Sequence, residues 1–313
     1  MLRPPALLLL LASIGACIEP TYDGTFPQRD DVAIVVPRGS AMPRGEVYDL
    51  VTSSAVAIDA RLADVVGDLA AVVEPLADRR ETSRDGGWLE FGPFDEGDAA
   101  YLVRVADDDA VTRWEVLVAR AGVTSVDSMA RVASGNISID GDEREGAVEV
   151  DLGVLEQHPE IGSGGGSGRI EADFSRNVVN GLRQVDLRLV DVVGDALVSD
   201  ADAVARVEPD GGGAFALVRD GELASTRSDR IEISARWRND GSGRARGIVR
   251  ALPDGDLVVD ECFDAAGMLT HRDLTESYAV LLPTYAFGDA STCVLAGEEL
   301  RVTRARSAAQ RRE

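Results

Sequence analysis

Few side chains in this sequence form a pattern that performs chemistry, and His271 is the first to consider. It lies nine residues after Cys262 and is flanked by Glu261, Asp264 and Asp273. A histidine that acts as a general base needs a nucleophile to deprotonate and is often oriented by a carboxylate. No G-x-S-x-G motif supplies a serine nucleophile. A hydrolase using His271 is therefore one hypothesis, and a solvent-exposed histidine on a hairpin is the other.

The composition excludes several enzyme classes. All 32 basic residues are arginine, so the chain lacks the lysine of Schiff-base enzymes, Walker motifs and protein kinases. The two histidines, His158 and His271, are too few for a three-histidine metal site. Acidic clusters at 107–109 and 140–143 do not have the spacing of an EF-hand loop. We therefore predict neither a metal nor another cofactor.

The net charge excludes a further class of partner. The 55 acidic residues exceed the basic ones and give a formal charge of -23. Such a charge repels phosphate backbones and anionic surfaces. We predict that the protein does not bind nucleic acid.

The first residues have the organisation of an export signal. Arg3 gives a positive start, the run from Ala6 to Ile14 is apolar with one serine, and the small residues Gly15 and Ala16 follow. This order is typical of a secretory signal peptide, which we place at residues 1–16. The apolar run is shorter than the roughly 20 residues that a transmembrane helix needs.

The segment Ile14-Gly15-Ala16-Cys17 resembles the lipobox of bacterial lipoproteins, where an aliphatic residue and two small residues precede an invariant cysteine. The resemblance implies that Cys17 is lipidated, becomes the first mature residue and holds the protein at the cell envelope. Ile18, in place of a retention aspartate, favours the outer membrane. Each buried acyl methylene contributes about 0.8 kcal/mol, so several chains anchor a protein without a spanning helix. The alternative is an ordinary signal peptide cleaved near Ala16.

Once Cys17 carries lipid, Cys262 and Cys293 remain as an even pair. In an oxidising compartment such a pair predicts a disulfide. Closing this loop should stabilise the fold by about 3.5 kcal/mol. Two separate buried thiols are the alternative.

Hydrophobic periodicity predicts one long helix. Apolar residues recur at steps of three and four from Glu46 to about Glu74, which indicates a helix with one buried face. Pro75 should end it because proline lacks the donor N–H. A break near Gly67 into two helices is the alternative.

After Arg80 the period changes to two. The clearest alternation is Ile231–Arg238, and Asx-Gly pairs such as Asp140-Gly141, Asn180-Gly181 and Asp220-Gly221 lie between such runs. Alternation indicates strands with one buried face, and Asx-Gly pairs favour tight hairpins. We predict about eight to eleven antiparallel strands, because the connections are too short for parallel crossovers.

These elements predict an α+β, mainly β fold: an antiparallel meander, as an open or partly closed barrel, covered by the long N-terminal helix. The layout is loosely similar to that of the lipoprotein-carrier family, where an open barrel receives acyl chains beneath a helical lid. We expect a tether over residues 17–44, in which 33–36 could add an edge strand, one domain over 45–300 and an Arg-rich disordered tail over 301–313. The Gly-rich run 162–168 could instead separate two halves.

Three functional hypotheses follow. The first is a lipid-anchored, non-catalytic structural or binding module of the envelope, whose partner is the membrane and an envelope protein. The second is a carrier or sensor of an apolar ligand, which requires a cavity of several hundred cubic ångströms between helix and sheet. The third is the hydrolase using His271.

Overall fold

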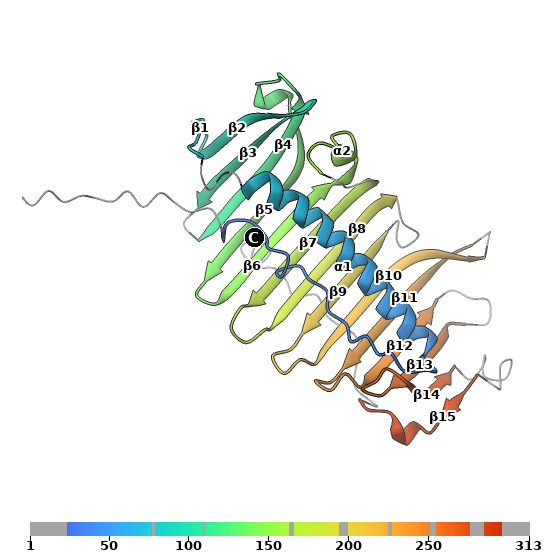
Figure 1. The fold of residues 1–313 in the computed structure, drawn as a ribbon. Helices are drawn as coiled ribbons and strands as arrows, with labels where there is room; N and C mark the ends of the chain where they lie inside the picture. The colour runs from blue at the N-terminus through green and yellow to red at the C-terminus, as the bar shows by residue number, and fades with distance from the viewer. Residues whose placement is uncertain are drawn as a thin grey trace, which may run out of the picture.

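The computed structural model describes residues 24–74, 76, 79–108, 110–162, 166–193, 200–224, 227–250, 255–275 and 285–295. These residues form one open antiparallel sheet of fifteen strands, in which each strand pairs with the next in the chain (Figure 1). The strands are β1 (Ser83–Asp85), β2 (Trp88–Glu96), β3 (Ala99–Asp108), β4 (Val111–Arg120), β5 (Ala130–Asp140), β6 (Glu143–Asp151), β7 (Ser167–Asn177), β8 (Arg183–Val193), β9 (Ala201–Val207), β10 (Gly213–Ala224), β11 (Arg227–Trp237), β12 (Gly243–Val249), β13 (Leu257–Phe263), β14 (Leu269–Leu274) and β15 (Phe287–Gly288). The predicted fold class is confirmed, with an open sheet and more strands than expected.

Tight turns explain why the chain folds as a meander. Gly141 closes the β5–β6 hairpin at φ 58° and Gly181 closes β7–β8 at φ 78°, a left-handed conformation that glycine adopts without steric cost. The pair Asp220-Gly221 is an exception, because it lies inside β10 and pairs with Arg230 and Asp229 of β11. Cross-strand pairing continues past this dipeptide, so its prediction as a turn was wrong.

The predicted long helix is α1 (Glu46–Val73), which is continuous through Gly67. A side chain at Gly67 would meet no neighbouring atom within 4 Å. A glycine at such an open position costs the helix only about 1 kcal/mol, so the alternative of two helices was wrong. The face of α1 that includes Val51, Leu62 and Val65 is buried.

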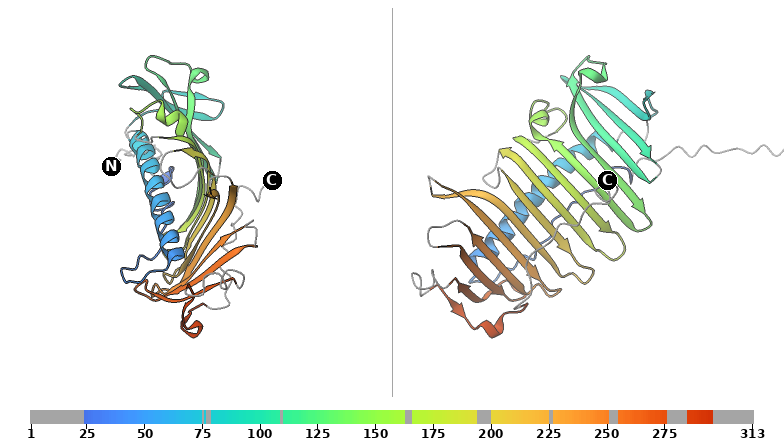
Figure 2. Two further views of the ribbon diagram at one scale, coloured as in Figure 1. Left: turned by 90° about the vertical axis from the view of Figure 1, so that its right-hand side faces the viewer. Right: turned by 180° about the vertical axis from the view of Figure 1, so that it is seen from behind.

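Helix α1 lies along one face of the twisted sheet (Figure 2). It packs against β10 to β13, whereas the short helix α2 (Leu152–Glu156) packs against β5 and β7. Buried side chains from nearly every strand join α1 in a single hydrophobic core. We call the face that carries α1 the inner face, and the opposite face of the sheet the outer face.

The prediction of a tether that extends to residue 44 was wrong for its described part. Residues 24–44 run beside α1 on the inner face (Figure 1), and Phe26, Val32, Ile34 and Val36 are buried in the core. Residues 33–36 form no strand, because the segment contributes its apolar side chains to the core instead of extending the sheet.

Pairing between β6 and β7 continues the sheet across the Gly-rich run, with Val148 opposite Ala172. A continuous sheet and a shared core support one domain over two separate halves. Residues 163–165 of that run lie outside the described residues, as do the signal peptide at 1–16 and the Arg-rich tail at 301–313.

Candidate functional site

The lipobox and Cys17 lie outside the described residues, so lipidation stays a prediction. Within the described ranges, no helix has the length and hydrophobicity required to cross a membrane. In the same residues, no three His, Cys, Asp or Glu side chains gather as a set of metal ligands.

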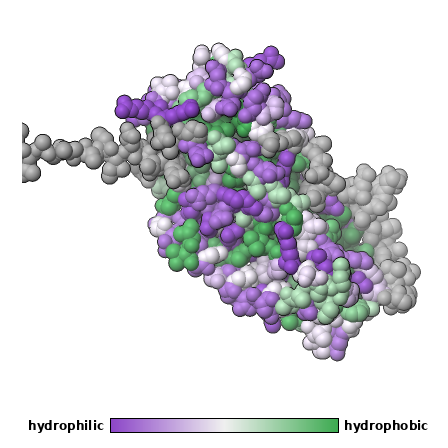
Figure 3. All heavy atoms as spheres, viewed as in Figure 1, coloured by the Kyte–Doolittle hydropathy of each residue, from purple (hydrophilic) through white to green (hydrophobic). Residues whose placement is uncertain are grey.

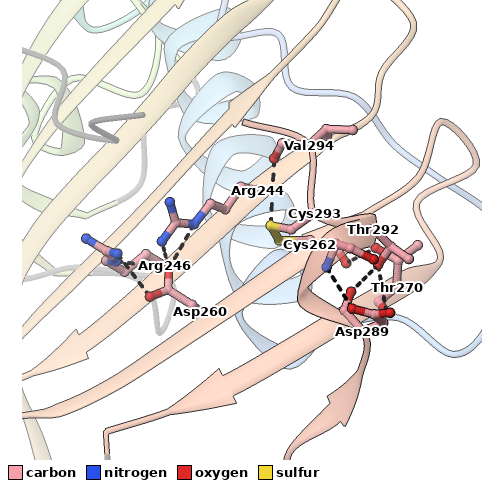
Figure 4. The surroundings of a disulfide bond; sticks show 10 residues. Arg244, Arg246, Asp260, Cys262, Thr270, Asp289, Thr292, Cys293 and Val294 are labelled. Carbon is pink, nitrogen blue, oxygen red and sulfur yellow. Dashed lines mark hydrogen bonds and ion pairs between the residues drawn. A yellow bond between two sulfur atoms is a disulfide. The ribbon is translucent and has the colours of Figure 1, made fainter. Parts of the chain in front are cut away.

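The predicted disulfide between Cys262 and Cys293 is present, with a Cα–Cα distance of 5.3 Å. Cys262 lies on β13, and Cys293 follows the short 3-10 helix η4 (Ala290–Thr292). Figure 4 shows the bond joining the two segments beside β14. The alternative of two separate thiols was wrong, and neither sulfur is a free thiolate.

His271 lies on β14 directly opposite Cys262 in the strand register. Its Nδ1 atom is buried and lacks a hydrogen-bond partner among the described residues. The three nearby carboxylates bond elsewhere: Glu261 to the start of α1, Asp264 to amides of the β13–β14 turn, and Asp273 to the next residue's amide. None of the three carboxylates that flank His271 in the sequence is therefore hydrogen-bonded to it among the described residues, and the carboxylate that interacts with it electrostatically is Asp289.

A buried carboxylate on the inner face fixes the start of α1. The Glu261 side chain is fully buried, and its Oε2 atom accepts hydrogen bonds from the amides of Val47 (2.9 Å) and Tyr48 (3.0 Å). Gly45 is the N-cap residue and has no side chain to do this. Burial raises the pKa of Glu261, while the helix amides and Arg272 oppose that rise. Glu261 therefore caps the N-terminus of α1 in place of the N-cap side chain, although it lies more than 200 residues later in the chain.

A second inner-face contact fastens the segment that precedes α1. Arg144, Arg176 and Arg183 lie side by side on β6, β7 and β8. The fully buried Asp31 accepts hydrogen bonds from Arg144 at 3.0–3.2 Å and from Arg176 at 3.4 Å. The Asp59 carboxylate of α1 accepts from the Ile34 amide at 2.7 Å. The segment is thus held by the sheet on one side and the helix on the other.

The outer face is covered by ion pairs instead of a helix. Asp260 accepts from Arg244 and Arg246 at 2.9 and 3.0 Å (Figure 4), and Arg250 donates to Glu232 at 2.6 Å. Pairs that face solvent contribute only about 0–1 kcal/mol each to stability. Their main effect is a highly polar surface on this side of the sheet.

The outer face has an open groove of about 410 Å³ across β4 to β7. The strand register brings outward-facing residues of these neighbouring strands together, with Ser134 opposite both Glu115 and Glu149. Partly exposed Trp88 lies at one end. The charged residues in the lining are Arg113, Arg131, Glu115, Glu149, Glu171 and Asp173.

This groove is the candidate binding site, and sequence reasoning missed it. Trp114 and Trp237 are buried, whereas Trp88 is partly exposed. The Arg104 and Arg113 guanidinium groups lie 4.9 and 5.6 Å from the Trp88 ring centre, which is within cation–π range. The sequence offered one signal for this site: Trp88 closely follows the Asp85-Gly86 pair, and a residue next to a turn is more often exposed than one in the middle of a strand.

The space between α1 and strands β5 and β6 is filled. The cavity there is lined by Val65, Leu69 and Val72 of α1 and by Val132 and Val150 of the sheet, and its volume is about 10 Å³. Such a space holds about one water molecule. In this part of the interior, no room remains for an acyl chain.

No known protein family matches this chain, and the comparisons found no similar curated protein and no similar solved structure.

Proposed function

We propose that the protein is an outer-membrane lipoprotein of the bacterial cell envelope, a lipid-anchored and non-catalytic binding module whose outer-face groove binds its partner. The lipobox-like segment ending in Cys17 supports export and anchoring. The groove on the outer face carries the proposal of binding, because it joins an aromatic ring to a set of convergent charges.

The charge of the whole chain favours a basic partner for the groove. Four lining carboxylates stand against two lining guanidinium groups, and the whole chain carries a formal charge of -23. The overall charge attracts cations to this surface. Within the groove, Glu115, Glu149 and Glu171 already pair with Arg104, Arg169 and Arg188, so a basic ligand would compete with these arginines for the carboxylates. An open groove across antiparallel strands suits a short peptide segment, so we propose a basic peptide segment of an envelope protein as the ligand.

The carrier hypothesis has less support. It requires a cavity of several hundred cubic ångströms between helix and sheet, whereas the cavity beside Val65 and Leu69 has about 10 Å³. The hydrolase hypothesis loses Cys262 as a nucleophile for His271, because its sulfur is in a disulfide.

Mass spectrometry of the mature N-terminus tests the anchor. We expect the first residue to be Cys17 carrying acyl chains, with residues 1–16 removed. A mature chain that starts elsewhere, or an unmodified Cys17, would contradict anchoring and leave the groove proposal to be judged alone.

Titration with an arginine tetrapeptide, followed by tryptophan fluorescence, tests the groove. We expect binding that weakens with added salt, and a several-fold loss of affinity when Glu149→Gln and Glu171→Gln are combined. Glu208→Gln is the matched control, because it removes a carboxylate at the β9–β10 turn, outside the groove. Equal affinity of the double variant and the control would refute the site.

A further inference from the structure

Two neighbouring hairpin tips expose apolar side chains where polar residues are usual. Ile139, near the β5–β6 turn, is 51% exposed, and Val178 and Val179, in the β7–β8 turn, are 47% and 74% exposed. Figure 3 shows apolar residues gathered along this margin of the molecule. We call these three residues the apolar tips.

The apolar tips are held firmly in place. The Val178 amide donates to the Asp142 carbonyl at 2.9 Å, which joins the two turns. The Asn177 side chain accepts from the amides of Val179 and Asn180 at 3.1 and 3.0 Å. The local hydrogen bonds thus present Val178 and Val179 to solvent instead of folding them onto the sheet.

The described chain begins beside the apolar tips. A side chain at Gly24 would lie 3.4 Å from Cδ1 of Ile139. Gly24 is seven residues after Cys17, and seven residues span at most about 25 Å. Strand β15 lies eight strand positions beyond β7, roughly 38 Å at about 4.8 Å per strand. A lipid on Cys17 would therefore keep the β5–β8 region of the sheet closer to the membrane than the β15 edge.

We infer that the apolar tips enter the surface of the bilayer that holds the anchor, an inference that rests on the proposed lipidation of Cys17. Exposed valine and isoleucine side chains gain free energy on leaving water, and short apolar segments at the interface add to the hold of a lipid anchor. Exposed carboxylates at Asp140, Asp142 and Glu143 flank the tips. The matching surface is therefore zwitterionic, because anionic lipid would repel these groups.

Depth-dependent quenching tests this contact. The mature lipidated protein is bound to phosphatidylcholine vesicles that contain nitroxide lipids, with a fluorophore placed through Val179→Cys. The native cysteines do not compete for the label, because Cys262 and Cys293 are bonded to each other and Cys17 carries lipid. We expect quenching and a blue shift at position 179, reduced by Val178→Asp and by replacing part of the lipid with phosphatidylglycerol.

The same label placed through Met42→Cys is the matched control. Met42 is 77% exposed and precedes Pro43, whose carbonyl bonds to Leu269 of β14, close to the β15 edge of the sheet. Equal quenching at positions 179 and 42, in protein that floats with the vesicles, would overturn the contact while leaving the anchor intact. Protein that fails to float with the vesicles, and takes a second label at Cys17, would overturn the anchor and with it this inference.

Discussion

Glu261 shows how much one buried side chain decides in this fold. Its carboxylate accepts from two α1 amides, lies 3.8 Å from an Arg272 nitrogen, and has one oxygen atom without a hydrogen-bond partner. A side chain at Gly45 would collide with this carboxylate. The Glu261 carboxylate thus leaves room only for glycine at position 45 and accepts the helix amides that a glycine N-cap cannot bond.

Replacing Glu261 tests the contribution of this contact. Glu261→Ala leaves two helix amides without acceptors and should cost about 2–4 kcal/mol of unfolding free energy. Glu261→Gln keeps an acceptor and should cost about 1 kcal/mol or less. Urea denaturation measures both variants, and equal losses would contradict a hydrogen-bonding role.

The pH dependence has a definite sign. Burial raises the pKa of Glu261 in the folded protein, so the folded state binds the proton more tightly than the unfolded chain does. This stabilising effect is fully present below the unfolded pKa and is lost as pH rises through the folded pKa. The stability of Glu261→Gln relative to the native chain should therefore improve as pH rises through that range. A constant difference between pH 4 and pH 8 would contradict this assignment.

The disulfide acts at the same scale. Cys293→Ser opens a loop whose ends are 31 residues apart, which should cost about 3.5 kcal/mol. The loss should disappear when both proteins are compared in reductant, because the native bond is then absent as well. A loss that persists in reductant would mean that the serine itself disturbs the packing.

At the scale of elements, ion pairs on the two faces differ in their effect. On the inner face, Asp31 is fully buried and Arg144 almost so, whereas Arg169 and Glu171 on the outer face are partly exposed. A buried charge that loses its partner pays the full cost of desolvation, while an exposed one is hydrated by water.

Two matched substitutions test this difference. Arg144→Met leaves Asp31 buried with a weaker partner and should cost about 3–5 kcal/mol. Arg169→Met removes an outer-face arginine of the same size and should cost about 1 kcal/mol or less. Urea denaturation measures both losses from the shift in midpoint, provided that the dependence of unfolding free energy on urea concentration is unchanged. Similar losses would show that Asp31 is hydrated in the Arg144→Met variant.

At the scale of the whole molecule, an open sheet needs a cover over its apolar face. Helix α1 supplies part of that cover, and the segment from Gly24 to Pro43 supplies another part. The Ala41 amide donates to the Ala266 carbonyl, and the Leu269 amide donates to the Pro43 carbonyl. The sheet also limits its free edges, because the edge strands β1 and β15 have three and two residues. Short edges reduce pairing with other chains.

Removing the segment from Gly24 to Pro43 tests whether it is part of the hydrophobic core or only a tether to the anchor. A chain that begins at Pro43 lacks four buried side chains, which together contribute about 6–12 kcal/mol, close to the total stability of a domain. We expect it to bind a hydrophobic dye and to lose cooperative unfolding, relative to a chain that begins at Gly24. Equal stability of the two chains would restore the tether interpretation.

The sequence alone determined the features that depend on neighbouring residues. The three-and-four spacing from Val47 to Val72 placed α1 almost to the residue, and alternation with Asx-Gly turns predicted an antiparallel meander. Both patterns are local, because a helix turn and a hairpin close within a few residues. The Cys262–Cys293 pair followed from counting.

Only the tertiary structure decided the features that depend on long-range register. The short apolar run from Val32 to Val36 suggested an edge strand, and nothing local showed that its buried side chains lie against α1 and the sheet instead. The groove likewise unites Glu115 and Glu171, whose strands β4 and β7 are separated by two others. Side chains on alternate positions share a face, but which strand lies beside which is settled only when the whole sheet is assembled.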